Sequence, residues 1–263
     1  MVTYLCSDES VGLGVTELVD NKALISNYLP TCLNGLISGF KENYFSDAEV
    51  LTSLLEKPAN LTLTMYPLKN FNAKIRTRSV EKNYDLDAVD PEFEFIEDSE
   101  GFLHTDDELI LIVEKESEIP GEDPLVSNNV INLSDGDFTI ELTVGRYSIN
   151  GMLMRHLGEG WARSELVIPD DELCVDEGLF SEEECFPLDG TTFNDTIFIG
   201  GVIFDEGTGF FEITPGDLDK DELTFYVYSA NIDHIDTMED VGAITLNSQY
   251  TIDHYDSLLP RFE

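Results

Sequence analysis

The sequence predicts an all-β protein made of two antiparallel β-sandwich domains of the immunoglobulin or transthyretin type, with long acidic loops and a short C-terminal tail of helical character. The chain has 263 residues and 42% apolar side chains, enough to bury one large core or two ordinary ones. Short runs alternate apolar with polar residues at the period-two spacing of half-buried strands. Gly, Pro and Asn residues separate these runs, as turns between strands require.

Residues 1–68 are predicted to form a small β-sandwich. Asn34-Gly35 has the composition of a hairpin turn, and Pro67 closes the module. Residues 46–56 are expected to be a short helix or a loop. Strands are expected at 2–5, 23–25, 35–40 and 61–66.

A larger acidic sandwich is predicted over residues 69–235. The segments 72–78, 138–143 and 147–153 alternate apolar with polar residues, as strands with one solvated face do. With further strands, about eight are expected in all, a number typical of a sandwich. These further strands are predicted at 108–114, 164–168, 196–204, 209–213 and 223–232.

Three long acidic loops are expected between these strands, because so many carboxylates cannot be buried. They cover residues 81–100, 116–126 and 169–195. The tail, residues 236–263, loses the alternation and is expected to hold one helix that ends at Pro260.

The net charge of −40 is divided unequally along the chain. Residues 1–80 carry 8 acidic and 7 basic side chains, whereas residues 81–263 carry 46 acidic and 7 basic. Adaptation to high salt would acidify every exposed surface, so this asymmetry argues against it. Such a surface repels nucleic acid and anionic lipid and attracts cations or basic proteins.

The spacing of the four cysteines predicts two sequence-local disulfides, Cys6–Cys32 and Cys174–Cys185. Neither pair has the spacing of a redox or zinc motif. Disulfides persist in oxidising compartments, so an extracellular or cell-surface location is expected. Four buried thiols in a cytosolic protein are the alternative.

Other features of the sequence bear on location. Three N-glycosylation sequons, at Asn60, Asn132 and Asn194, give slight further support for secretion. Residues 1–6 have no basic and apolar leader pattern, so no signal peptide is expected on this segment. No run of about 18 apolar residues occurs, so no direct membrane insertion is expected.

Two clusters of residues suggest metal binding. Asp217, Asp219 and Asp221 alternate as in a calcium loop, but Glu222 stands where the EF-hand turn needs Gly, so a plain turn is the alternative. The pattern Ile-Asp-His-x-Asp occurs twice, twenty residues apart. On strands, the paired side chains of each copy would share a face and could bind a divalent metal; these residues are His234, Asp236, His254 and Asp256.

Residues 29–44, Leu-Pro-Thr-Cys-Leu-Asn-Gly-Leu-Ile-Ser-Gly-Phe-Lys-Glu-Asn-Tyr, resemble a strand pair of carboxypeptidase-regulatory-like, transthyretin-like sandwiches found in large archaeal cell-surface proteins. In that family the pair ends in a Lys-x-Gly-Tyr turn after a Pro-x-Cys-x-Asn-Gly segment. The run 142–149 is similar to the Pro-Gly-x-Tyr-x-Val start of a strand in related sandwiches. The sequence departs at Asn43, where the family has Gly, and at Val144, where it has Pro. The resemblance implies a structural or adhesive module without catalytic residues.

No nucleophile elbow, HExxH helix or phosphate-cradling glycine loop occurs in the sequence, so no enzymatic activity and no cofactor apart from calcium is expected. The predicted function is a non-catalytic structural or adhesive module of the cell surface, with an anionic face that cations stabilise. Its expected partners are neighbouring domains of a larger surface protein or a basic protein. The alternatives are a viral surface or decoration protein, and a polyanionic nucleic-acid mimic that binds a basic protein.

Overall fold

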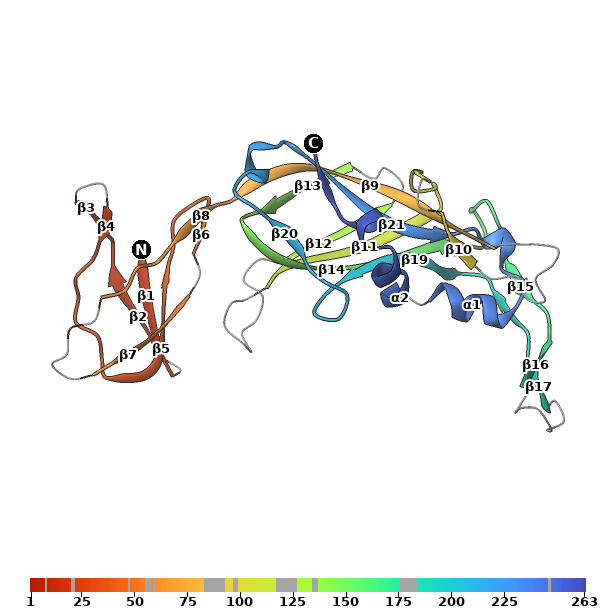
Figure 1. The fold of residues 1–263 in the computed structure, drawn as a ribbon, viewed down its shortest axis with the longest axis horizontal. Coiled ribbons are helices and arrows are strands. Elements are labelled where there is room, and N and C mark those ends of the chain that lie inside the picture. Colours follow the sequence, from red (N-terminus) through yellow and green to blue (C-terminus); the bar gives the residue numbers. More distant parts are fainter. Residues whose placement is uncertain are drawn as a thin grey trace.

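The computed structural model describes residues 1–7, 9–19, 22–46, 48–54, 58, 60–82, 93–96, 99–116, 127–133, 137–175, 184–245 and 247–263. Over these residues the protein is mostly β, with open, curled sheets and three short α-helices (Figure 1). None of the helices in this part of the chain is long and apolar enough to cross a bilayer. The prediction of a mostly β protein is confirmed.

The N-terminal region folds around one four-stranded antiparallel sheet of order β2-β1-β5-β7, and two further strand pairs, β3–β4 and β6–β8, flank it. One face buries a small cluster that includes Tyr4 and Ile37. The helix or loop expected at 46–56 is wrong, because this segment contains a strand of the sheet. The bounds are β1 Val2–Cys6, β2 Glu9–Gly14, β3 Glu17–Val19, β4 Lys22–Leu24, β5 Cys32–Gly39, β6 Tyr44–Ser46, β7 Glu49–Ser53 and β8 Met65–Pro67.

Asn34-Gly35 does not form the expected hairpin turn, because β5 runs through both residues. Asn34 adopts a left-handed backbone with φ of 55°, and the register between β5 and β7 shifts between Cys32 and Gly35. A Cβ at Gly35 would lie 2.5 Å from Cζ of Tyr4, so only glycine fits beside this buried ring. The pair therefore makes a bulge inside a strand.

The larger sheet has the strand order β10-β9-β21-β19-β14-β11-β12, with three strands pairing to the sides of this path. All its ladders are antiparallel except β9–β21, which is parallel over nine residue pairs. Parallel pairing joins the first strand of this region to a strand near its end. The bounds are β9 Lys69–Lys82, β10 Phe93–Phe95, β11 Asp107–Lys115, β12 Ser127–Leu133, β13 Asp137–Leu142, β14 Gly145–His156, β19 Thr196–Phe204, β20 Phe211–Ile213, β21 Glu222–Ala230 and β22 Arg261–Phe262.

Buried hydrophobic residues of the described chain fall into two separate clusters. The first lies within residues 2–37 and the second within residues 71–258. In the second, β11 alternates strictly between buried and half-buried positions, as the side chains of a strand do. Besides the four-stranded sheet, the described residues of the N-terminal region form the two-stranded sheets β3–β4 and β6–β8.

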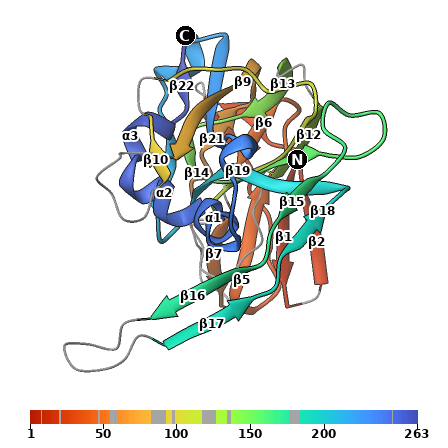
Figure 2. The same cartoon turned by 90° about the vertical axis from the view of Figure 1, so that its right-hand side faces the viewer.

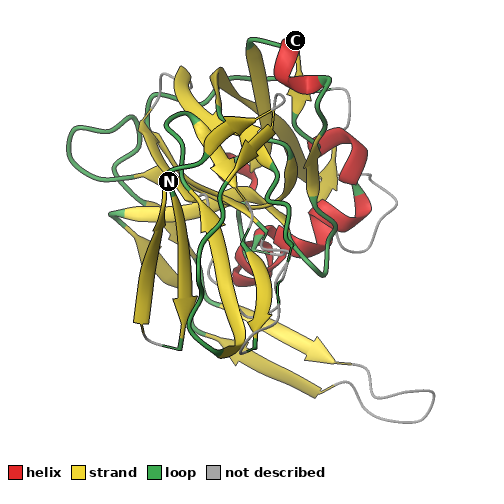
Figure 3. Cartoon of the chain, turned by 90° about the vertical axis from the view of Figure 1, so that its left-hand side faces the viewer, coloured by secondary structure: helices red, strands yellow, loops and turns green. Residues whose placement is uncertain are grey.

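The C-terminal tail packs against the larger sheet. Ile244 and Leu258 belong to the same hydrophobic cluster as the strands, and the buried Tyr228 hydroxyl donates a hydrogen bond to the carbonyl of Ile244 at 2.6 Å. Figure 3 shows the helices gathered on one side of the strands. Instead of one helix ending at Pro260, the tail holds three short ones, because Thr245 and His254 end or interrupt them. The helices are η1 Asp217–Asp219, η2 Ile232–His234, α1 Met238–Ile244, α2 Asn247–Asp253 and α3 Tyr255–Leu258.

The segment expected to be an acidic loop at 169–195 contains three short strands, β16, β17 and β18. β16 pairs with β17, and β18 pairs with β15, which lies just before the segment; both pairs are antiparallel. The β16–β17 hairpin extends away from the main sheet (Figure 2). The other two expected acidic loops lie largely outside the described residues. The bounds are β15 Leu166–Ile168, β16 Asp171–Val175, β17 Glu184–Leu188 and β18 Thr191–Phe193.

Candidate functional site

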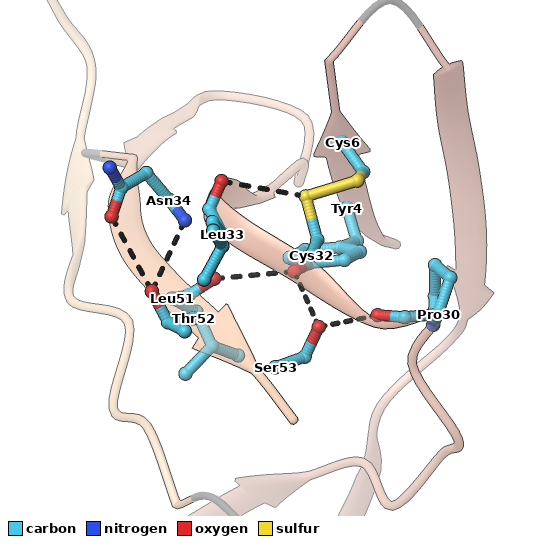
Figure 4. The surroundings of a disulfide bond; sticks show 9 residues. All are labelled: Tyr4, Cys6, Pro30, Cys32, Leu33, Asn34, Leu51, Thr52 and Ser53. Carbon is cyan, nitrogen blue, oxygen red and sulfur yellow. Dashed lines mark hydrogen bonds between the residues drawn. A yellow bond between two sulfur atoms is a disulfide. The ribbon is translucent and has the colours of Figure 1, made fainter. Parts of the chain in front are cut away.

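The N-terminal sheet carries a disulfide between Cys6 of β1 and Cys32 of β5, with Cα atoms 6.0 Å apart (Figure 4). Beside it the buried Tyr4 hydroxyl contacts the hydroxyl of Ser53 at 2.9 Å and donates to the carbonyl of Leu51 at 3.2 Å. Ser53 in turn donates to the carbonyl of Pro30. These contacts tie three strands and the segment before β5 around one covalent link.

The second expected cysteine pair lies on the β16–β17 hairpin. The register places Cys174 directly opposite Cys185. Directly opposed positions of an antiparallel pair have Cα atoms about 4.5 to 5.5 Å apart, within the range that a disulfide spans. The side chains of these two residues lie outside the described part, so their pairing stays a prediction.

Two carboxylates of the expected calcium loop, those of Asp217 and Asp221, have partners within the chain. Asp217 accepts hydrogen bonds from the backbone and hydroxyl of Thr214, at 2.8 and 2.6 Å. Asp221 pairs with Lys69 at 2.7 Å, and the hydrogen bond from this ammonium lowers the pKa of Asp221. Asp217 and Asp219 lie on the short helix η1, so this segment is built as a turn before β21.

The two Ile-Asp-His-x-Asp segments do not lie on strands, so the shared strand face on which the metal hypothesis depended does not form. His234 is the last residue of η2, and Asp236 follows it, 3.7 Å from the ammonium of Lys82. His254 precedes α3 and Asp256 lies in its first turn. Within the described ranges, no three His, Cys, Asp or Glu side chains are arranged to hold a metal ion together.

Two of the three sequons lie in accessible positions. Asn60 is exposed before β8, and Asn194 is exposed in the bend between β18 and β19. Asn132 lies on β12, opposite Leu109 of β11, and its side chain is outside the described part. Exposed loop positions are those that glycosylation requires.

Sequence reasoning missed a polar cluster at one end of β11 and β14. Asp107 is 1% exposed, and Arg155 binds it through two hydrogen bonds of 2.6 and 3.1 Å. Next to this pair, His156 lies 2.9 Å from Glu108 and stacks on Trp161, with ring centroids 4.6 Å apart. The partners are 48 residues apart, so no local pattern could reveal them.

Further donors from the chain hold the carboxylates of this cluster. The backbone N–H of His104 donates to Asp107 at 2.8 Å, and that of Ala162 donates to Asp106 at 3.0 Å. The cluster therefore fastens the Trp161 turn to the end of β11. Buried carboxylates whose hydrogen bonds are satisfied in this way stabilise a fold.

Basic residues are concentrated on β9, which contains five of the fourteen Lys and Arg residues of the chain. Several pair with acidic residues of distant segments, and Lys82, which is 6% exposed, binds Asp240 of α1 at 2.8 Å. Burial opposes the charge on Asp240, but the bond from Lys82 and those from the backbone N–H groups of Asp236 and Thr237 outweigh it and lower its pKa. This pair fastens the C-terminal helices to the first strand of the large sheet.

A small hollow lies where β9, β14 and β21 meet. Its volume is about 230 Å³, below the 300 to 1,000 Å³ usual for pockets that enclose a small molecule. Its lining includes Thr77, Ser79 and Arg155, and the guanidinium of Arg155 is already engaged by Asp107.

No protein-family model, curated protein or solved structure matches the chain, so no relative assigns a role to these residues. The class that the fold and these sites define is a strongly acidic, mostly β protein with open sheets and a disulfide in its N-terminal sheet.

Proposed function

We propose that the protein is a non-catalytic structural or adhesive module of an extracellular or cell surface. The observation that carries this proposal is the separation of its hydrophobic residues into two clusters. The chain passes from the first to the second through β8 and the start of β9 (Figure 1). Two folded units in series, residues 1–68 and 69–263, are what a spacer between neighbouring partners needs.

The distribution of charge supports different roles for the two units. Residues 1–68 carry 8 acidic and 3 basic side chains, and residues 69–263 carry 46 acidic and 11 basic. The larger unit, at net −35, resists close contact with anionic surfaces and with copies of itself. It therefore acts as the soluble, spacing part, whereas the smaller unit is free to make contacts.

The extracellular location is supported by the Cys6–Cys32 disulfide, because such bonds persist outside the reducing cytosol. The two exposed sequons fit the same compartment. The resemblance of residues 29–44 to sandwich modules of cell-surface proteins also supports an extracellular location.

The proposal is tested on intact source cells. The cells are treated briefly with a protease that cannot enter them, and the chain is then detected with an antibody. The protease is expected to abolish the antibody signal of this chain while a cytosolic marker protein stays intact. Full protection of the chain would overturn the surface location. Turnover of a glycan, ester or peptide substrate, lost on replacing one carboxylate or histidine, would overturn the non-catalytic role.

A further inference from the structure

Three of the six arginines of the chain meet on one face of the large sheet. Arg76 and Arg78 are two residues apart on β9, so their side chains leave the strand on the same side. Arg261 lies on β22, which pairs with β21, the strand next to β9 (Figure 2). The guanidinium carbons of Arg78 and Arg261 lie 4.5 and 5.3 Å from the centre of the Tyr226 ring, which β21 contributes. We call Arg76, Arg78 and Arg261 the arginine cluster.

One carboxylate, that of Glu100, contacts two of these arginines loosely. It lies 3.6 Å from Nε of Arg76 and 4.0 Å from Nη1 of Arg78, and both distances are too long for hydrogen bonds. The Glu100 side chain is 51% exposed. Within the described part of the chain, no carboxylate lies within 4.0 Å of the Arg261 guanidinium. Three positive charges therefore share one loosely held negative charge.

Other acidic groups on this side of the sheet act on a different cation. Lys74 is the residue of β9 that precedes Arg76 on the same face, and Glu222 forms an ion pair with it. The hydrogen bond from Lys74 to Glu222, together with the charges of Glu222, Glu263 and Asp137, raises the pKa of Lys74. These carboxylates are engaged by Lys74, and the arginine cluster keeps its excess of positive charge.

Arg78 also has a buried donor that no group of the described chain satisfies. The residue is 5% exposed, and its Nη1 donates to the carbonyl of Ser99. Its Nε is shielded from solvent and has no hydrogen-bond partner. The ring of Tyr226 does not supply one, because a guanidinium over a ring uses the face of its plane, whereas its N–H donors point along the plane. More than about nine in ten buried polar groups are paired, so this donor calls for an explanation.

We propose that the arginine cluster binds a small dianion, sulfate or phosphate, which replaces the Glu100 carboxylate between Arg76 and Arg78. The planar fork of donors on a guanidinium matches the oxygens of such anions, and these charge-assisted hydrogen bonds are about twice as strong as neutral ones. A tetrahedral dianion has an oxygen at every corner, so it can accept from several arginines at once, Nε of Arg78 included. It also carries one negative charge more than Glu100 and balances the cluster better.

The charge of the whole molecule restricts the ligand to a small one. Residues 69–263 carry 46 acidic and 11 basic side chains, a charge that repels polyanions such as nucleic acids and anionic lipid surfaces. A small ion at the cluster responds mainly to the charges near it, because salt screens the more distant ones over a Debye length of about 8 Å. The ligand is therefore a free sulfate or phosphate ion, or a single ester of either on an otherwise uncharged molecule.

An exposed aromatic ring lies beside the cluster. Phe102 is 75% exposed, and the guanidinium carbon of Arg76 lies 4.2 Å from the centre of its ring. A ring in this position offers apolar surface to the carbon skeleton of an ester, next to the cations that bind its charged group. We therefore expect an ester to bind more tightly than the free ion.

The test is a titration of the full, oxidised chain with sodium phosphate and sodium sulfate, followed by the NMR signals of the arginine Nε–H groups. Sodium chloride at the same ionic strength is the reference, because salt also screens the repulsion within this acidic protein. The Nε–H signal of Arg78 is expected to shift and saturate with a Kd on the order of 1 mM. The signal of Arg146, which lies over the ring of Phe210 at 4.1 Å and outside the cluster, is expected to stay in place.

Variants measured by isothermal titration calorimetry with phosphate assign the binding to these residues. Arg76→Gln and Arg261→Gln each remove charge-assisted contacts and are expected to weaken binding about tenfold. Glu100→Gln removes the competing charge and is expected to tighten binding about two- to fivefold. Arg146→Gln removes an exposed arginine with the same kind of ring contact and is the matched control, with no change expected. Circular dichroism shows whether each variant folds, and the exposed positions of Arg261 and Glu100 keep the test valid if Arg76→Gln does not.

An Arg78 signal that responds to chloride as it does to phosphate and sulfate would overturn the site, and so would equal binding by wild type and Arg261→Gln. Acetate that binds as tightly as phosphate would overturn the preference for a dianion, and an unchanged affinity of Glu100→Gln would overturn the replacement of Glu100. Glucose 6-phosphate distinguishes the two sources of the anion: tighter binding than phosphate supports an ester, and weaker binding supports the free ion. Anion binding does not depend on the compartment of the protein, so each result stands apart from the test of the surface location.

Discussion

The hydroxyl of Tyr147 closes a ring with the backbone of Thr143, four residues before it. It accepts a hydrogen bond from the Thr143 N–H at 2.9 Å and donates one to the Thr143 carbonyl at 3.0 Å. The two residues stand where the chain leaves β13 and enters β14, which pair with different strands. This is the geometry of a tyrosine corner, a feature of Greek-key β-sandwiches. The Thr143 hydroxyl also donates to the carbonyl of Pro67 at 2.8 Å, which connects the corner to the last residue of β8.

Replacement of Tyr147 by Phe is expected to lower the free energy of unfolding by about 1 to 3 kcal/mol, because the buried N–H and carbonyl of Thr143 lose their partner. Urea unfolding followed by circular dichroism measures the change. Tyr28→Phe, at a position that is 97% exposed, is the matched control and is expected to have no effect. Equal stability of both variants would show that the corner contributes nothing.

Asp240→Asn is expected to destabilise the protein by about 3 kcal/mol, because it leaves the buried ammonium of Lys82 without its nearest carboxylate. Breaking a buried ion pair usually costs about 3 to 5 kcal/mol. We expect the lower value because Asp236 stays 3.7 Å from the same ammonium. Asp233→Asn makes the same chemical change in a pair with Arg163, where the carboxylate is 76% exposed, and about 0 to 1 kcal/mol is expected. Thermal and urea unfolding of the two variants give the comparison, and similar losses would contradict the role of burial.

The same pair predicts a dependence of stability on pH. The pKa of Asp240 is lowered in the folded protein from its usual 3.8, so the folded state favours the carboxylate. Its contribution is therefore fully present above the unfolded pKa and is lost as pH falls through the lower, folded pKa. The difference in unfolding free energy between wild type and Asp240→Asn is expected to be constant above about pH 5 and to shrink as pH falls below 3.8 and through the lower, folded pKa. A difference that stays constant to the lowest pH would show that the charge on Asp240 is not what stabilises the contact.

Much of the strand content could be predicted from the sequence, because alternation is a local signal. The expected segment 72–78 lies within β9, and 147–153 lies within β14. Strand pairing could not be predicted in this way. No local sequence pattern shows that β9 pairs with β21 in parallel, or that Arg155 binds Asp107. These contacts join residues that are distant in the chain, and they depend on how the whole sheet curls.

Local signals also failed where a tertiary contact decided the conformation. Asn34-Gly35 has the ideal composition for a hairpin turn, but the ring of Tyr4 occupies the space next to Gly35 and β5 continues through it. The first Ile-Asp-His-x-Asp segment could bind a metal through one face only on a strand, but the backbone N–H of Asp233 donates to the side chain of Asn231, and this cap starts a short helix there. Such caps compete with strand pairing for the same backbone groups.

The disulfides give a prediction about local stability. Among its described residues, the small unit has a buried cluster of five. The Cys6–Cys32 bond is expected to contribute roughly 3 kcal/mol, and its reduction is expected to open this unit first. Hydrogen exchange after mild reduction would show β1 and β5 losing protection while β21 keeps it. Peptide mapping without reductant is expected to recover Cys6–Cys32 and Cys174–Cys185. Four free thiols or crossed pairs would remove the argument for an oxidising compartment.

The divided charge predicts that salt stabilises the larger unit more than the smaller one. Residues 69–263 carry 46 acidic and 11 basic side chains on one folded body, and their mutual repulsion opposes compaction. Monovalent salt screens this repulsion over a Debye length of about 8 to 10 Å near physiological strength, so sodium chloride is expected to raise the melting temperature of this unit.

Hydrogen exchange on the full chain can follow β21 and β1 as reporters of the two units, and β21 is expected to gain protection with salt while β1 changes little. Calcium chloride at matched ionic strength is expected to give the same gain, because Asp217 and Asp221 already bind Thr214 and Lys69. A specific site binds the native state and stabilises it by mass action at low concentration. A gain at far lower calcium than sodium would therefore reveal such a site, and equal responses of β21 and β1 to sodium would show that the charge asymmetry has no energetic effect.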